Sequence, residues 1–278
     1  MLSSKVHGFT VGESLKFNVQ SLMFKVCEMK ILFAFLAVIS LQFVHAQDIN
    51  TLMKEASDLE KQVNESAALE KYKQIVSLDA KNVTALTKCA EFNCNIGARE
   101  KDKSTKLNFY NTAKNYAQQA IDADANNADA NYVMAFSIMK MAEVETDNKR
   151  IAPLIHDTKT YIDKSLHANP AFAKTNNILG KWHYEMLHSS WIKKPGVKAF
   201  YDVLQEAEID SAILYFEKCR RFDQYYVRNY LDLAYAYHFD NQPAKAIETL
   251  NMMAKLPNRT VDDAALKQQG KLLWDQLQ

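Results

Sequence analysis

The stretch Leu78-Asp79-Ala80-Lys81-Asn82 is the first of four related sequences that together decide the fold. The other three are Ala123-Asp124-Ala125-Asn126, Ala168-Asn169-Pro170-Ala171 and Phe222-Asp223-Gln224-Tyr225. The third residue of each copy serves as an anchor for alignment: Ala80, Ala125, Pro170 and Gln224. Aligned on these anchors, the flanking sequences repeat the same order of small and large side chains.

Small residues recur ten positions after each anchor, and each is preceded by a larger, mostly apolar one. The small residues are Ala90, Ala135, Gly180 and Ala234, and the larger ones are Cys89, Met134, Leu179 and Leu233. Further sets lie five, eight and twelve residues before the anchors: Ile75, Ala120, Ser165 and Cys219; Tyr72, Ala117, Ile162 and Phe216; Ala68, Ala113, Thr158 and Ala212. Such a register across four copies predicts stacked helical hairpins, whose small residues let two helices approach closely.

This pattern resembles the tetratricopeptide repeat. The stretch Ala68–Ala80 is similar to a second repeat helix with its exit turn, and Tyr230–Tyr237 is similar to a first helix. The resemblance implies an all-α fold, an α-α superhelical solenoid of helical hairpins. The anchors lie 45, 45 and 54 residues apart, with Pro257 another 33 along, whereas the usual repeat has about 34 residues. We therefore expect longer helices, or added residues between them, in the first three units.

A more specific resemblance runs from Leu179-Gly180-Lys181-Trp182-His183-Tyr184 to Ser190-Trp191-Ile192-Lys193-Lys194. Two tryptophans, a glycine and a basic loop at these offsets resemble the signature of the regulator of microtubule dynamics family, whose members are tetratricopeptide-like. The likeness covers roughly residues 125–278. The family name describes eukaryotic biology, which we do not expect to transfer, because the start of this chain is typical of an exported bacterial protein.

Several helices are expected from the apolar periodicity. They span residues 48–62, 64–78, 83–97, 104–122, 128–145, 152–167, 171–189, 207–222, 225–239 and 243–255. A last helix should follow Thr260-Val261-Asp262-Asp263, with Thr260 as its N-terminal cap and acids in its first turn. We expect this helix, which ends near Leu277, to cover the apolar end of the solenoid.

Residues 29–46 predict a secretory signal peptide. Met29-Lys30 supplies the charged start, Ile31–Val44 the apolar core, and Ala46 the small residue before cleavage. The apolar run is shorter than the ~20 residues of a membrane span. We expect a mature repeat domain over residues 47–278 in the periplasm or outside the cell.

Two readings of residues 1–28 remain open: translation starts at Met29, or the chain has an unusually long leader. The alternative to cleavage is that the apolar run is kept as a short anchor. No cysteine follows the cleavage site, so a lipoprotein anchor is not indicated.

Charge and cysteine usage narrow the class of partner. Lys and Arg number 34 against 33 Asp and Glu, so nucleic acid is not an expected partner, because neutralising phosphates requires a basic excess. Cys89 and Cys219 fall on repeat core positions, and Cys94 points to another side of its helix. We therefore expect small buried thiols and no disulfide framework.

No catalytic, metal or cofactor arrangement is expected. The chain lacks the His-Glu-x-x-His, Cys-x-x-Cys and Gly-x-Ser-x-Gly motifs and any Gly-rich phosphate loop. His183 and His188 lie about 140° apart around a helix and cannot easily share a metal; His183 also falls on a packing position. Trp182 and Trp191 are expected to pack in the core or anchor a loop. We expect a non-enzymatic protein without a cofactor.

The first helices of such hairpins line the concave face of the solenoid. Positions 7, 11 and 14 after each anchor share one helical stripe. They are Thr87, Glu91 and Cys94; Tyr132, Phe136 and Met139; Asn177, Lys181 and Tyr184; Leu231, Tyr235 and His238. The second and fourth sets are apolar and aromatic, which on an exposed face marks a binding surface. The alternative is that an inter-helix segment or the last helix folds over this groove.

The first functional hypothesis is an exported scaffold that binds a protein or peptide partner in its groove. The predicted contact residues are Tyr132, Phe136, Met139, Lys181, Tyr184, Trp191, Tyr235 and His238. Lys181 and the 193–198 segment would favour an acidic partner. The second hypothesis is a carrier or tether for a lipid or other apolar ligand, which needs a deep, closed groove rather than an open one. Any membrane contact would be peripheral.

Overall fold

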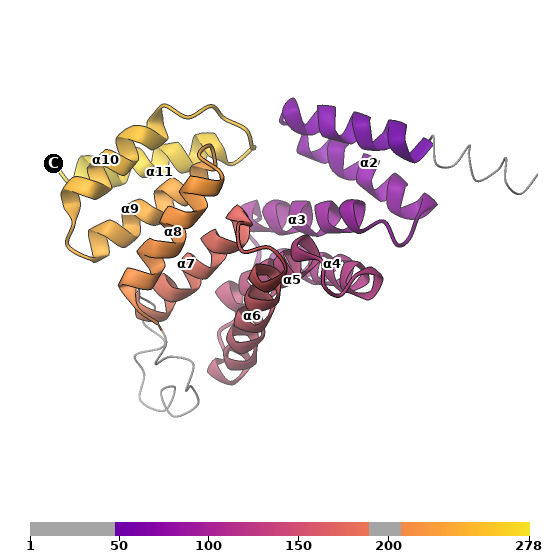
Figure 1. The fold of residues 1–278 in the computed structure, drawn as a ribbon, viewed down its shortest axis with the longest axis horizontal. Helices are drawn as coiled ribbons and strands as arrows, with labels where there is room; N and C mark the ends of the chain where they lie inside the picture. The colour runs from indigo at the N-terminus through magenta and orange to yellow at the C-terminus, as the bar shows by residue number, and fades with distance from the viewer. Residues whose placement is uncertain (1–47, 189–206) are drawn as a thin grey trace, which may run out of the picture. The chain divides into compact units, whose positions relative to one another are not determined.

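The computed structural model describes residues 48–188 and 207–278, and these ranges contain helices and no strand (Figure 1). A helix over residues 48–61 comes first. It is followed by α2 (Glu65–Leu78), α3 (Val83–Arg99), α4 (Lys103–Ala123), α5 (Ala128–Val144), α6 (Asn148–Ala168), α7 (Ala173–His188), α8 (Ile209–Phe222), α9 (Val227–Phe239), α10 (Pro243–Ala254) and α11 (Asp263–Gln276). The predicted signal peptide and Trp191 lie outside the described residues.

Consecutive helices pair as antiparallel hairpins. α3 packs on α4, α5 on α6, α7 on α8 and α9 on α10, and each first helix also contacts the preceding hairpin (Figure 1). The all-α solenoid expected from the sequence is therefore confirmed. Among the described helices, none combines the length and apolar character needed to cross a bilayer.

Each of the four related sequences forms the turn between two hairpins. Its acidic or amide residue ends one helix and then accepts a hydrogen bond from the backbone N–H two residues further on. The four residues and the bond lengths are Asp79 (3.1 Å), Asp124 (3.1 Å), Asn169 (3.1 Å) and Asp223 (3.0 Å). In two copies the next asparagine begins the following helix: the side chains of Asn82 and Asn127 accept from the third residue on, at 3.1 and 3.0 Å.

The recurrent small and large positions form the core, as the register predicts. All the small residues ten positions after an anchor are buried, as are Cys89, Cys94 and Cys219. Gly180 shows the close approach directly, because a Cβ placed there would lie 2.7 Å from the Phe216 ring and 3.0 Å from the Ala212 carbonyl oxygen. Only glycine fits this crossing of α7 and α8 without displacement.

The enlarged repeats are explained in part by longer helices. α3 and α5 have 17 residues and α4 and α6 have 21, against 13 and 12 for α9 and α10. α6 begins at Asn148, earlier than the expected residue 152, because Asp147 accepts a hydrogen bond from the Lys149 N–H at 3.0 Å. In the third unit, α7 and α8 have 16 and 14 residues, and the added residues lie between them.

The start of the last helix differs from the expectation. Asp262, not Thr260, is the N-cap of α11, and its side chain makes no capping bond. Asp263 is buried and accepts hydrogen bonds from the backbone N–H groups of Arg259 and Thr260, at 2.6 and 2.9 Å. Thr260 therefore donates hydrogen bonds to the Asp263 carboxylate and does not cap the helix. α11 then packs on α9 and α10 through Leu266 and Leu273, which covers the end of the stack.

Candidate functional site: a groove on the first helices

Two cavities lie along the side formed by the first helices, here called the groove. The first, of about 140 Å³, lies among α3, α5, α7 and α9 and includes Glu91, Tyr132, Lys174 and Arg228 in its lining. The second, of about 340 Å³, lies among α7, α9 and α11. Tyr184, Leu231 and Tyr235 contribute its apolar lining. Arg228 borders both, so the two cavities are adjacent parts of one surface.

The predicted contacts on α5 lie deeper than expected. Tyr132, Phe136 and Met139 are 2%, 6% and 9% exposed and belong to the main core cluster. An exposed face at Tyr132, on which its predicted role in the groove depends, is not found, because α5 is buried all round from residue 131 to 140. A helix that is apolar on all sides is an interior helix. Tyr132 and Phe136 form only the floor of the first cavity, where their rings stack at 5.8 Å.

The other predicted contacts are less buried. Tyr184 and Tyr235 are half-buried and line the second cavity; Tyr184 stacks on His188 with ring centroids 5.2 Å apart. His238 is exposed and lines neither groove cavity. Lys181 borders the second cavity, but its ammonium group binds Glu143 at 2.8 Å. The structure therefore brings together only part of the predicted set.

His183 and Trp182 take the packing roles that the sequence predicts. Trp182 is 3% exposed. His183 is buried and stacks on the Tyr215 ring with centroids 5.7 Å apart. Burial lowers the pKa of His183 to about 4, and the nearby Lys159 charge acts in the same direction. This imidazole is therefore neutral at physiological pH.

Glu91 is the centre of a polar cluster at the floor of the first cavity. Its carboxylate accepts hydrogen bonds from Lys174 at 2.5 Å and from the Tyr132 hydroxyl at 3.3 Å. Burial opposes the charge on Glu91, but Lys174 and Lys88 outweigh it and hold the pKa below its usual value. Glu91 is therefore ionised, and its cluster joins α3, α5 and α7.

Glu143 holds a second cluster between α5 and α7. It accepts hydrogen bonds from Lys140 and Lys181, both at 2.8 Å. Burial opposes ionisation of Glu143, but the two lysines outweigh it and hold its pKa far below the usual range. Burial lowers the pKa of Lys140, whose side chain is only 8% exposed. Lys140 therefore depends on this carboxylate to carry its charge.

The turn before α11 is fastened to the groove by charge. Asp262 binds Arg99 at 3.1 Å and Arg228 at 3.6 Å, and Arg99 also pairs with Glu65 on α2. Arg259 lies 3.9 Å from Asp223. The alternative in which the last helix covers the groove therefore holds in part, because Leu266 lines both cavities.

Comparison with known proteins identifies the family. The profile for regulator of microtubule dynamics protein 1-3 matches residues 52–278. The chain belongs to this family. It is 25% identical to regulator of microtubule dynamics protein 3 of Rattus norvegicus over 169 residues, covering 60% of this chain and 35% of the relative. Against protein 1 of Mus musculus it is 23% identical over 162 residues, covering 58% and 53%. The chain thus spans between a third and about half of these relatives.

Solved structures place this regulator of microtubule dynamics family member among tetratricopeptide-repeat folds. The thermophilic TPR protein TTC0263 of Thermus thermophilus superposes with a TM-score of 0.60 at 12% identity, over 81% of this chain and 99% of that one. PilF of Pseudomonas aeruginosa gives 0.50 at 11% identity, over 84% and 90%. At these identities the likeness shows the fold alone.

Sequence reasoning missed two groove residues of this family member, Lys174 and Arg228. Both lie four positions after an anchor, one helical step before the first position of the stripe. Extending the stripe by three residues toward the helix start would have included them, because positions 4 and 7 share a face. No sequence pattern marks the residues of α11 that line the cavities, because α11 reaches the groove only through the tertiary fold.

The Glu143 cluster of this family member gives a prediction with a defined pH dependence. Because the folded pKa is depressed, the stabilisation is present above the unfolded carboxyl value of ~4.3 and is lost as pH falls toward the folded pKa. Glu143→Gln should cost about 1–3 kcal/mol at pH 7, a range discounted for partial exposure. Urea melts should show this difference shrinking below about pH 4.3.

Glu70→Gln is the matched control, because Glu70 pairs with Lys73 on an exposed face. It should change stability by less than about 0.5 kcal/mol. If Glu143→Gln is as destabilising at pH 3 as at pH 7, the depressed pKa does not account for the stabilisation.

Proposed function

We propose that the chain is a non-enzymatic scaffold that binds a protein or peptide partner in the groove. The observation that carries the proposal is the pair of adjacent cavities on the first helices, which share Arg228 and retain half-buried aromatic side chains at their surface. Tyr184 and Tyr235 are rigid aromatic groups of the kind that anchor interfaces. The tetratricopeptide-like fold supports a protein partner.

The charge of the lining points to a partner segment without net negative charge. The carboxylates of the two cavities are Glu91, Glu185, Asp223, Asp232, Asp262 and Asp263, and the cations are Lys174, Lys181, Arg228 and Arg259. Lys181 is held by Glu143. Lys181 was the described cation expected to attract an acidic partner, and Glu143 already neutralises it. We therefore propose that the partner segment is neutral or basic.

Site-specific photo-crosslinking tests the scaffold proposal. A photoreactive residue at Gln269, on the exposed rim of the second cavity, should capture the partner from native extract. The same residue at Thr112, exposed on the second helix α4, should not. Tyr235→Ala should lower capture at Gln269 about tenfold or more, as expected for an aromatic anchor. Equal capture at both positions would place the binding surface elsewhere.

A lipid or other apolar ligand is the alternative occupant. The second cavity favours it to a limited degree, because Phe216, Leu231 and Tyr235 give it an apolar side. Its volume of about 340 Å³ lies at the lower end for pockets that enclose a drug-sized molecule, ~300–1,000 Å³. Solvent extraction of the purified native protein, followed by mass spectrometry, would favour this alternative if one lipid co-purifies in stoichiometric amount.

We also propose export, on the signal-peptide pattern of residues 29–46. The expected mature N-terminus is Gln47. Intact-mass measurement of protein secreted by its native host should show loss of everything before this residue. A species that keeps residues 31–44 and sediments with membranes would contradict it.

A further inference from the structure

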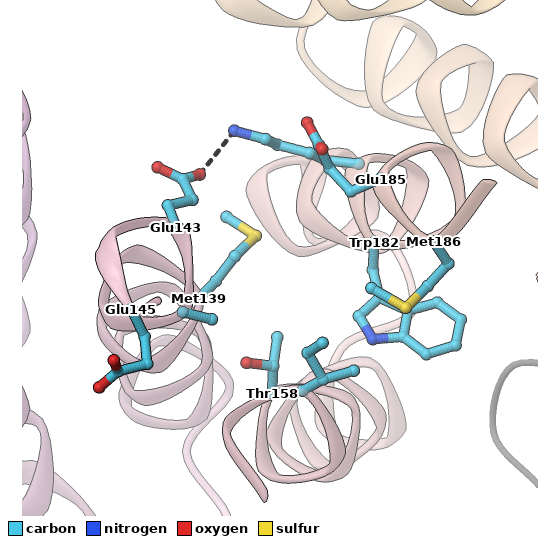
Figure 2. A pocket seen from close by; sticks show the side chains of 10 residues that line it. Met139, Glu143, Glu145, Thr158, Trp182, Glu185 and Met186 are labelled. Carbon is cyan, nitrogen blue, oxygen red and sulfur yellow. Dashed lines mark hydrogen bonds and ion pairs between the residues drawn. The ribbon is translucent and has the colours of Figure 1, made fainter. Parts of the chain in front are cut away.

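A third cavity lies next to the groove, between the hairpin of α5 and α6 and the following helix α7 (Figure 2). Its volume is about 260 Å³. The walls are mostly apolar: Met139 comes from α5, Ile155 from α6, and Trp182 and Met186 from α7. Methionine side chains adapt their shape to what they contact. The cavity therefore has walls suited to an apolar body.

One polar atom of these walls has no protein partner. Trp182 is 3% exposed, and its indole Nε1 is buried without a hydrogen-bond acceptor among residues 48–188 and 207–278. Figure 2 shows the nitrogen-bearing edge of this ring turned toward the hollow on the Thr158 side. The Thr158 hydroxyl donates to the Leu154 carbonyl at 2.7 Å. A buried indole N–H usually finds an acceptor. One in the cavity would reach it after a shift of the flexible methionine side chains in the lining.

Charged side chains of both signs border the cavity. Glu143, Glu145 and Glu185 line it together with Lys181. Glu143 binds both Lys181 and Lys140 at 2.8 Å. The Lys159 ammonium lies 6.0 Å from the centroid of the Trp182 ring. Cations therefore stand close to these carboxylates, and a neutral ligand suits the apolar walls best, because burying an unpaired charge costs free energy.

We propose that this cavity binds a compact, neutral aromatic ligand that accepts a hydrogen bond from Trp182 Nε1. A dry cavity of ~150 Å³ is large enough to bind benzene, so about 260 Å³ admits two fused rings. The apolar walls would enclose the rings, and the indole N–H would select ligands with an acceptor at one edge. The site borders the groove, because Lys181 and Glu185 line both this cavity and the second groove cavity.

Quinoline and naphthalene make a matched pair of probes, because they have the same fused-ring shape and only quinoline has an acceptor nitrogen. Calorimetric titration of the full folded domain at pH 7.5 should show quinoline binding about tenfold more tightly, equal to about 1.4 kcal/mol. Quinoline-4-carboxylate should bind more weakly than quinoline, because its charge would lose hydration in the cavity. In ¹H–¹⁵N spectra, quinoline but not naphthalene should move the Trp182 indole signal downfield.

Trp182→Phe should keep an aromatic wall and remove the donor. The preference for quinoline should then fall to one or below, because its buried nitrogen loses a hydrogen bond to water without gaining another. Trp274→Phe is the control, since Trp274 packs in the separate C-terminal cluster and should leave the preference unchanged. Ala142→Leu should block the mouth and weaken both probes, whereas Ala98→Leu on α3 should weaken neither.

The Ala142 pair keeps the test decisive if Trp182→Phe fails to fold. No binding of quinoline at millimolar concentration would overturn the proposal, as would a tenfold preference that survives Trp182→Phe. Equal binding of both probes to the wild-type protein would show that the indole does not select the ligand.

Discussion

Gly180→Leu should unfold a large part of the population or lower the free energy of unfolding by about 3 kcal/mol, the upper end for overpacking. A Cβ at this position already overlaps the Phe216 ring at 2.7 Å and meets the Ala212 carbonyl oxygen at 3.0 Å. Phe216 is fully buried and cannot swing aside, and the carbonyl belongs to the backbone of α8. Urea melts measure the effect.

A smaller side chain at position 216 supplies the control for the Gly180 prediction. Phe216→Leu should make room for a methyl group, so Gly180→Ala should cost less in the Phe216→Leu background than in the wild type. A coupling of about 0.5–3 kcal/mol is expected for residues in contact. Additive effects of the two substitutions would mean that the ring does not limit this helix crossing.

Tyr132→Ala should cost about 3–5 kcal/mol, because it removes a buried aromatic ring and leaves a cavity. Tyr235→Ala should cost clearly less, since this ring is only half-buried. Each single variant is measured by urea melts with the wild type alongside. The comparison tests whether Tyr132 is a core residue and Tyr235 a surface residue of the groove.

Tyr132→Phe separates packing from hydrogen bonding at the same position. It keeps the ring and loses only the hydroxyl that donates to Glu91 at 3.3 Å, so a loss of about 0.5–1.5 kcal/mol is expected. If Tyr132→Ala proves no more costly than Tyr235→Ala, α5 is less tightly enclosed than its burial indicates.

The repeat architecture could be predicted because its signals are local. The Asp or Asn of each recurrent phrase makes its turn bond only two residues away, as Asp79 does with Lys81. The small-residue positions report contacts within one hairpin, such as Gly180 against α8. The recurrent turn sequence and the spacing of the small residues are therefore sufficient to predict the order of the helices and the positions of their buried residues.

The groove could be predicted only in outline. The periodicity placed Tyr132 on the correct helix, but it could not show that the opposite side of α5 is also enclosed, because this depends on neighbouring hairpins. Glu143 was not singled out, since its importance arises from Lys140 on the same helix together with Lys181 on another. The hollow beside Trp182 likewise depends on how Met139 and Met186 leave space between separate helices.

Arg99 gives the stack a long-distance constraint. In a simple linear array each unit is stabilised only by its immediate neighbours, so the two ends can fray independently. Here one guanidinium group joins Glu65, near the first hairpin, to Asp262, at the start of the last helix. Unfolding of either end of the stack would break one of the two ion pairs of Arg99 and so weaken the attachment of the other end. The helices α2 and α11 should therefore exchange their amide hydrogens with correlated protection, as parts of one cooperative unit.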